Sequence, residues 1–188
     1  MSTELSTTNE TAIRTTGSWK IDPAHTQVGF AVKHLMISTV RGRFTGLSGS
    51  VEVDPATGAP AVDVSIDVAS LVTGDEKRDA HLRSADFFQA DAFPTIRFTS
   101  RGFEGDLEGR FQLFGDLTIR GTTRRIALDV VNEGTARDPW GGERLGVTAT
   151  TRLSRKDFGL EWNVALETGG VLVGDEVRIS IEAQLVRQ

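Results

Sequence analysis

Hydrophobic residues recur at every second position through most of the chain after residue 18, and this feature constrains the fold most strongly. The clearest example is residues 61–69 (AVDVSIDVA), in which β-branched residues alternate with small or acidic ones. Successive side chains of a strand point to opposite faces, so this alternation indicates a strand with one apolar and one polar face. A helix would spread the same side chains around its circumference, and β-branched residues favour strands.

The same alternation recurs in seven further segments, so the sequence predicts about eight strands. Short stretches rich in turn-forming residues connect several of them, as at 54–58 (DPATG), 121–123 (GTT) and 138–142 (DPWGG). Strands joined by such short turns are antiparallel, which excludes a parallel sheet with crossover helices. The further segments are residues 27–32, 44–53, 95–99, 111–119, 125–130, 145–153 and 177–185.

Residues 74–92 break the alternation and predict one or two short helices. Asp75 and Ser84 are candidate N-caps, and Phe87, Phe88 and Phe93 are the candidate buried face. We expect this segment to cover an open end of the sheet.

Eight antiparallel strands with one polar face can form a sandwich or a closed barrel. Strands of this length span roughly 30 Å, and an eight-stranded barrel is just wide enough to hold one small ligand, as in lipocalins. Glycines inside the strands suit the bends of a barrel. We therefore expect an all-β fold: an eight-stranded antiparallel, lipocalin-like barrel with one or two short helices.

The first 17 residues are rich in Ser and Thr and predict a disordered polar tail, followed by a single barrel domain over residues 18–188. This tail lacks the basic and apolar regions of a signal peptide, and no apolar run is long enough for a transmembrane helix. We therefore expect a cytoplasmic protein. The 26 acidic and 21 basic residues give a net charge of −5, which argues against nucleic-acid binding.

Most catalytic and metal chemistry finds no support in the sequence. The chain has no Cys, and its histidines, His25, His34 and His81, lack the spacing of a zinc site, so we expect no metal. Neither a GxSxG elbow nor a phosphate-binding loop occurs. Residue order alone leaves a Ser–His–Asp site open.

The apolar strand faces fit two interpretations. Most alternating apolar faces make a filled core, which the residues alone favour slightly. The same side chains could instead line a cavity for an apolar ligand.

Several strings, each weak alone, together resemble the YceI-like family. They occur in the order of that family and span residues 18 to 187. They are residues 19–26 (WKIDPAHT), 78–88 (RDAHLRSADFF), 93–100 (FPTIRFTS), 115–123 (GDLTIRGTT), 155–160 (RKDFGL) and 173–177 (VGDEV).

The resemblance implies a lipocalin-like barrel that binds a polyisoprenoid or an isoprenoid quinone in its lumen. It favours a cavity over a filled core and implies a homodimer. It also implies no catalytic residue and no cofactor other than a bound lipid. Many members of the family carry a signal peptide, from which this chain departs.

We therefore expect a non-catalytic binding or carrier protein whose lumen is lined by ten apolar side chains. One alternative is an enzyme that acts on such a lipid through His34 or His81, which a buried His–carboxylate pair in the cavity would favour. The other is a stress-related structural barrel with a filled core, which a cavity well below about 300 Å³ would favour. The ten residues are Phe30, Val32, Val64, Ile66, Phe98, Leu117, Ile119, Leu128, Val147 and Ile179.

Overall fold

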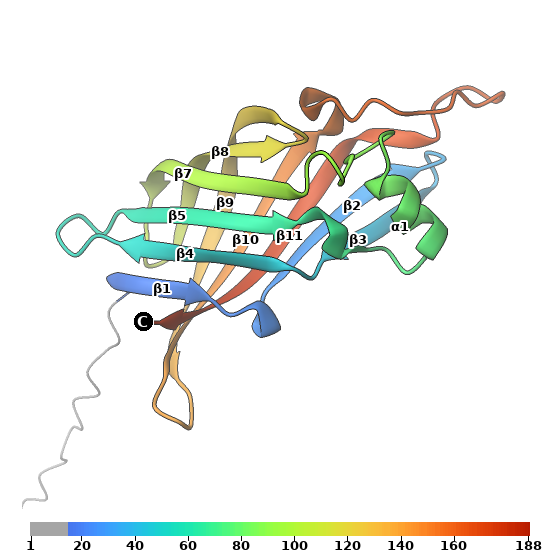
Figure 1. Cartoon of the computed structure of the whole chain (residues 1–188). Coiled ribbons are helices and arrows are strands. Elements are labelled where there is room, and N and C mark those ends of the chain that lie inside the picture. The colour runs from blue at the N-terminus through green and yellow to red at the C-terminus, as the bar shows by residue number, and fades with distance from the viewer. Residues whose placement is uncertain (1–14) are drawn as a thin grey trace, which may run out of the picture.

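The computed structural model describes residues 15–188, which form one antiparallel sheet that closes on itself into a barrel (Figure 1). Closure occurs because β1 pairs with β11 on one side and with β4 on the other. The strands are β1 (Gly17–Ile21), β2 (Gln27–His34), β3 (Ser38–Phe44), β4 (Leu47–Val53), β5 (Pro60–Asp67), β6 (Leu71–Val72), β7 (Thr95–Gly105), β8 (Arg110–Ile119), β9 (Thr122–Arg137), β10 (Glu143–Ser154) and β11 (Val173–Arg187).

Three of the barrel's strands are bent, and each is counted as two of these segments. β1 and β2 both lie along β11, β4 and β3 follow beside them, and β5 and β6 come next. With β7 to β11 they make a closed ring of eight antiparallel strands, which confirms the predicted fold. The bends fall at the 3-10 turns η1 (Pro23–His25) and η2 (Val68–Ser70) and at residues 45–46.

The strand predicted over residues 44–53 is therefore wrong at its start, because the chain bends at Thr45 and β4 begins at Leu47. Gly46 makes the bend possible: a Cβ there would lie 3.0 Å from the Cβ of Ser70 and 3.2 Å from that of Asp67. The backbone of the β3–β4 bend thus packs closely against the β5–β6 bend.

The segment that lacked alternation contains one helix, α1 (Glu76–Arg83), which lies beside β6 at one end of the barrel (Figure 1). Asp75 is its N-cap, as predicted, and accepts a hydrogen bond from the Arg78 N–H at 2.9 Å. Ser84 ends this helix instead of starting a second one, because its backbone N–H and its hydroxyl both donate to the carbonyl of His81. Residues 85–93 form turns.

Most of the predicted polar tail, residues 1–14, lies outside the described residues. Gly17, which was assigned to that tail, is instead the first residue of β1. The carbonyls of Thr15 and Thr16 accept hydrogen bonds from the Trp19 indole at 2.6 Å and the Arg187 guanidinium at 2.7 Å. No helix within residues 15–188 is long and apolar enough to cross a membrane.

The buried apolar residues form two clusters inside the barrel. The smaller lies where β1, β4, β10 and β11 meet, around Trp19, which has no exposed surface. The guanidinium of Arg187 lies over the Trp19 ring, 4.6 Å from its centroid. The larger cluster extends along the other strands to the α1 end and includes Leu71 and Phe87.

Candidate functional site

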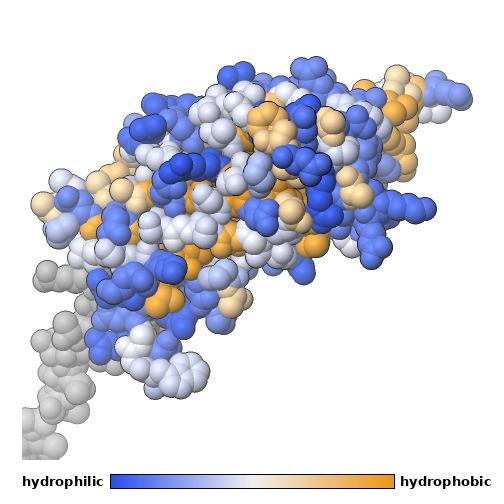
Figure 2. Space-filling view, viewed as in Figure 1, coloured by the Kyte–Doolittle hydropathy of each residue, from blue (hydrophilic) through white to orange (hydrophobic). Residues whose placement is uncertain are grey.

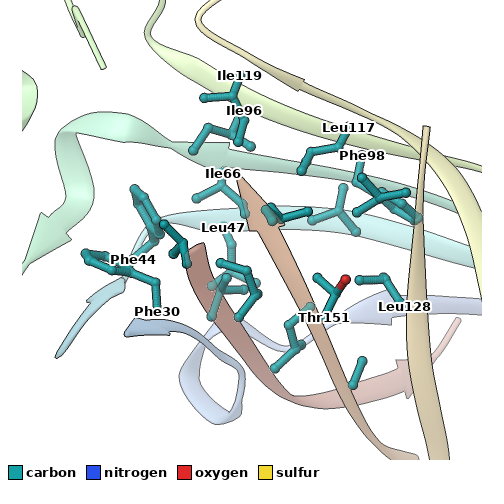
Figure 3. Close-up of a pocket in the computed structure, with 18 of the residues that line it drawn as sticks. Phe30, Phe44, Leu47, Ile66, Ile96, Phe98, Leu117, Ile119, Leu128 and Thr151 are labelled. Atoms are coloured by element: carbon teal, nitrogen blue, oxygen red, sulfur yellow. The ribbon is translucent and has the colours of Figure 1, made fainter. Parts of the chain in front are cut away.

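An elongated cavity of about 670 Å³ occupies the barrel lumen. It extends from the β4–β5 and β7–β8 turns, where Pro60 and Leu107 line it, to α1 at the opposite end, where His81 lines it (Figure 1). Its walls are almost entirely apolar side chains from nearly every strand (Figure 3). The volume lies within the range of small-molecule sites, about 300–1,000 Å³. The filled-core interpretation of the apolar faces is therefore wrong.

The structure places all ten predicted lumen residues on the wall of this cavity. The sheet register aligns them across neighbouring strands: Val64 is paired with Phe98, and Phe98 with Leu117. On the other side of the lumen Phe30 is paired with Ile179. Because side chains alternate strictly along a strand, the inward face could be identified from the sequence.

Two glycines keep the large rings of this wall out of the middle of the lumen. A Cβ on Gly115 would lie 2.3 Å from the ring of Phe98, and one on Gly42 would lie 2.3 Å from the ring of Phe30. Each ring therefore lies over the backbone of the neighbouring strand, where only glycine leaves room for it. The wall stays aromatic while the lumen stays open.

An aromatic cluster lines the α1 end of the cavity. The imidazole of His81 meets Trp162 edge-on at 4.6 Å between centroids and Phe87 at 5.2 Å. Its Nε2 lies 2.8 Å from a carboxylate oxygen of Asp86. The side chains of this pair are 38% and 50% exposed and only His81 lines the cavity, so the pair lies at its edge.

Arg155, on the 3-10 turn η3 (Arg155–Phe158), holds the loop after η3 at the same end of the barrel. Its buried guanidinium donates to the carbonyls of Leu160 at 2.6 Å, Trp162 at 2.9 Å and Gly174 at 2.9 Å. Burial lowers the pKa of Arg155, and the nearby carboxylate of Asp175 opposes that shift. Sequence reasoning gave Arg155 no role, because its partners are carbonyls that the sequence pattern does not reveal.

Few polar groups line the lumen. Thr151 on β10 places its hydroxyl among apolar side chains (Figure 3), and this hydroxyl makes no hydrogen bond with residues 15–188. Most of the other polar wall residues lie toward the two ends of the barrel, among them Asp75, Lys77, Arg78, Lys33 and His34 at the α1 end, and Thr15 and Asn132 at the other. Within the described part of the chain, no three His, Asp or Glu side chains are grouped to hold a metal ion.

Comparison with known families decides what kind of barrel this is. The model of the YceI-like domain matches residues 19–185. The chain belongs to the YceI-like family. The strings that resembled this family therefore identified it correctly.

Other YceI-like and related proteins resemble the chain over most of its length. A UPF0312 protein of Vibrio cholerae is 40% identical over 139 residues, which cover 73% of this chain and 74% of that relative. The solved YceI protein of Campylobacter jejuni is 32% identical, with a TM-score of 0.71 over 83% of this chain and 90% of that one. A polyisoprenoid binding domain from Saccharophagus degradans shares the fold at 16% identity, with a TM-score of 0.70 over 90% of this chain and 98% of that one.

Proposed function

We propose that this YceI-like protein is a non-catalytic carrier that holds a long apolar lipid of the isoprenoid type, a polyisoprenoid or an isoprenoid quinone, in its lumen. The observation that carries the proposal is the continuous apolar cavity of about 670 Å³ along the barrel. The Saccharophagus domain, which has the same fold, is described as polyisoprenoid binding. That description supports the lipid class, and the chemistry of the walls supports it independently.

Apolar walls favour a hydrocarbon chain because they offer dispersion contacts and almost no hydrogen bonds. Each buried CH₂ contributes roughly 0.8 kcal/mol, so a five-carbon isoprene unit contributes about 4 kcal/mol before opposing terms. Ordering a flexible chain opposes part of that gain. An elongated lumen therefore selects for long, apolar chains, while the polar residues at its ends are the groups available to a head group.

The absence of catalysis is part of the proposal. A buried His–carboxylate pair inside the cavity would favour an enzyme, but the His81–Asp86 pair is partly exposed at the edge of the cavity. Two further expectations, a cytoplasmic location and a homodimer, stay predictions. Cell fractionation and light scattering of the purified chain check them.

Substitutions at Ile66 and at the two lumen histidines test the carrier against the enzyme. Ile66 lies on the lumen wall (Figure 3), so Ile66→Asp places a carboxylate where the lipid chain should lie and should abolish lipid retention. Ile66→Thr keeps the β-branch and should retain less lipid than the wild type. His34→Gln and His81→Gln should retain lipid within a few-fold of the wild type.

Retention is measured by organic extraction and mass spectrometry of variants that circular dichroism shows to be folded. If the His variants abolished a turnover of the lipid while Ile66→Thr kept its full lipid content, the enzyme would replace the carrier. If the folded Ile66→Asp variant kept its full lipid content, the lumen would not be the binding site.

A further inference from the structure

Large exposed apolar side chains gather at one end of the molecule. Five are exposed within residues 15–188, and four of them belong to one surface: Leu35 (38% exposed), Met36 (57%), Ile37 (83%) and Val164 (46%). We call these four residues the apolar tip. Figure 2 shows hydrophobic surface at the corresponding end. Single exposed apolar residues are ordinary, but a contiguous group marks an interaction site.

Hydrogen bonds hold the parts of the apolar tip together. Leu35 N–H donates to the Leu172 carbonyl at 2.8 Å, and Leu172 N–H donates to the Val164 carbonyl at 2.9 Å. A Cβ on Gly170 would lie 3.5 Å from Cγ of Met36. The β2–β3 turn and residues 163–172 therefore form one projection beyond the barrel, on the side of α1 (Figure 1).

Neither turn chemistry nor core packing accounts for the residues of the tip. Leu35 and Met36 have φ values of 52° and 61°, in the left-handed region that hairpin turns usually fill with Asn, Asp or Gly. This left-handed backbone conformation is energetically unfavourable for residues with long side chains, and here the side chains are also exposed to solvent. An apolar partner outside the chain would account for both features.

The apolar tip adjoins the lumen. His34, the residue before the tip, lines the cavity, and so does Leu172, which is hydrogen-bonded to Leu35. Trp162, two residues before Val164, lines the α1 end together with His81. Whatever covers the tip therefore also contacts the end of the barrel where the lumen meets polar residues.

Cations flank the apolar tip. Lys33 on β2 and Arg41 on β3 are exposed, and neither of them forms an ion pair with residues 15–188. Acidic residues also lie at this end: Glu167 is on the loop of the tip, while Asp175 and Glu176 at the start of β11 pair with Lys156 and Arg152.

An apolar projection flanked by unpaired cations complements the surface of an anionic bilayer. Apolar side chains enter the boundary between head groups and acyl chains, while Lys and Arg side chains attract anionic head groups. A second copy of the chain fits less well, because a symmetric contact would bring the same cations face to face.

We propose that the apolar tip docks the protein on an anionic lipid bilayer, with the α1 end of the lumen facing the membrane. The docking is inferred from the apolar tip and its cations. Its role, the exchange of lipid with the membrane, rests on the proposed carrier function.

Sedimentation of the full chain with phosphatidylcholine vesicles tests the proposal, with and without phosphatidylglycerol. We expect the protein to bind vesicles that contain phosphatidylglycerol, and to bind them more weakly as the salt concentration rises. Binding to vesicles of phosphatidylcholine alone should be weaker. The double variant Met36→Ser/Ile37→Ser should bind at least about tenfold more weakly, because two apolar side chains are removed from the lipid boundary. Lys33→Gln/Arg41→Gln should weaken binding and reduce its dependence on salt.

Trp140→Ser is the matched control. Trp140 is 88% exposed at the β9–β10 turn, away from α1 (Figure 1), so its loss should leave vesicle binding unchanged. Circular dichroism verifies that each variant is folded. Size-exclusion chromatography reports whether the tip instead joins two copies of the chain.

Three results would overturn the proposal: no binding of the wild type to anionic vesicles, equal binding by Met36→Ser/Ile37→Ser, or an equal loss in Trp140→Ser. A tip variant that only converts a dimer into a monomer would assign the tip to self-association. Organic extraction of lipid from the lumen distinguishes a failure of docking from a failure of the carrier function. A protein that docks normally but never contains lipid would refute the carrier and leave the docking intact.

Discussion

The hydroxyl of Thr151 is a polar group in an apolar lumen with no hydrogen-bond partner among residues 15–188. An unpaired hydroxyl costs free energy that an apolar group of similar shape does not. Because Thr151 is only half-buried, Thr151→Val should raise the free energy of unfolding of the lipid-free protein by less than about 1.5 kcal/mol. Urea unfolding measures this change. A loss of stability in Thr151→Val would mean that the hydroxyl has a partner in the folded state.

Phe87 is a second residue whose substitution should measurably change the free energy of unfolding. It is 5% exposed and contacts both His81 and Trp162 at the end of the cavity. Phe87→Ala should lower the free energy of unfolding by about 3–5 kcal/mol, because it removes a buried ring and leaves a void. Trp140→Ala, at an exposed position, should change it by less than about 0.5 kcal/mol. A loss below about 1 kcal/mol in Phe87→Ala would contradict the burial of that ring.

At the scale of elements, an ionic network joins two loops beyond the lumen. Arg144 on β10 donates to Asp22, before η1, at 2.7 Å and to Asp138 in the β9–β10 turn at 3.0 Å. Hydrogen bonds from His25 and Arg144 hold the pKa of Asp22 below its ordinary value. Hydrogen bonds from the backbone N–H of Gly142 and from the guanidinium of Arg144 likewise hold the pKa of Asp138 below its ordinary value.

A lowered carboxyl pKa stabilises the fold above the ordinary value of 3.8, and this contribution is lost as the pH falls through the folded-state pKa. Asp22→Asn should therefore lower the melting temperature by about 2–4 °C at neutral pH. The difference from the wild type should shrink as the pH falls below about 4, where the wild-type carboxyl also loses its charge.

Thermal melts followed by circular dichroism across this pH range measure the effect. Asp63→Asn is the control, because the Asp63–Arg97 pair is 45% and 60% exposed and should contribute little. A difference between Asp22→Asn and the wild type that did not change with pH would contradict an ionic origin.

The sequence was sufficient to predict the elements that depend on local alternation. The inward face of β5, with Val64 and Ile66, followed from period two, and the cap of α1 followed from Asp75. The bends were not predictable in the same way. β6 has two residues, too few to show a period, and the break at residues 45–46 depends on contact with the distant β5–β6 bend.

The contribution of the loop after η3 to the α1 end was missed for a related reason. The loop after η3 is held by Arg155 through backbone carbonyls, which no side-chain pattern reports. Thr151 shares the inward parity of Val147 and Ala149, but as a polar residue it was not included in the predicted wall. Alternation therefore identified which side chains face inward, whereas the polar residues that shape the cavity needed the three-dimensional structure.

At the scale of the whole molecule, the barrel has two different ends. The lumen is apolar along its length, its polar residues lie mainly at the ends, and the apolar tip projects beyond only one of them. A lipid bound as proposed would lie with its polar group at an end and its chain along the walls. Docking through the apolar tip, as proposed, would place loading and release at the α1 end.

Native mass spectrometry of the purified full chain, followed by organic extraction, tests most directly whether the lumen holds an apolar lipid. We expect an added mass on the folded wild-type protein that extraction recovers as an isoprenoid-type lipid. Val147→Trp narrows the lumen from its wall with a larger apolar side chain, so the folded variant should carry less of this mass. A wild-type protein that neither contains a lipid nor takes up a polyprenol from detergent micelles would contradict the account, as would equal lipid in folded Val147→Trp.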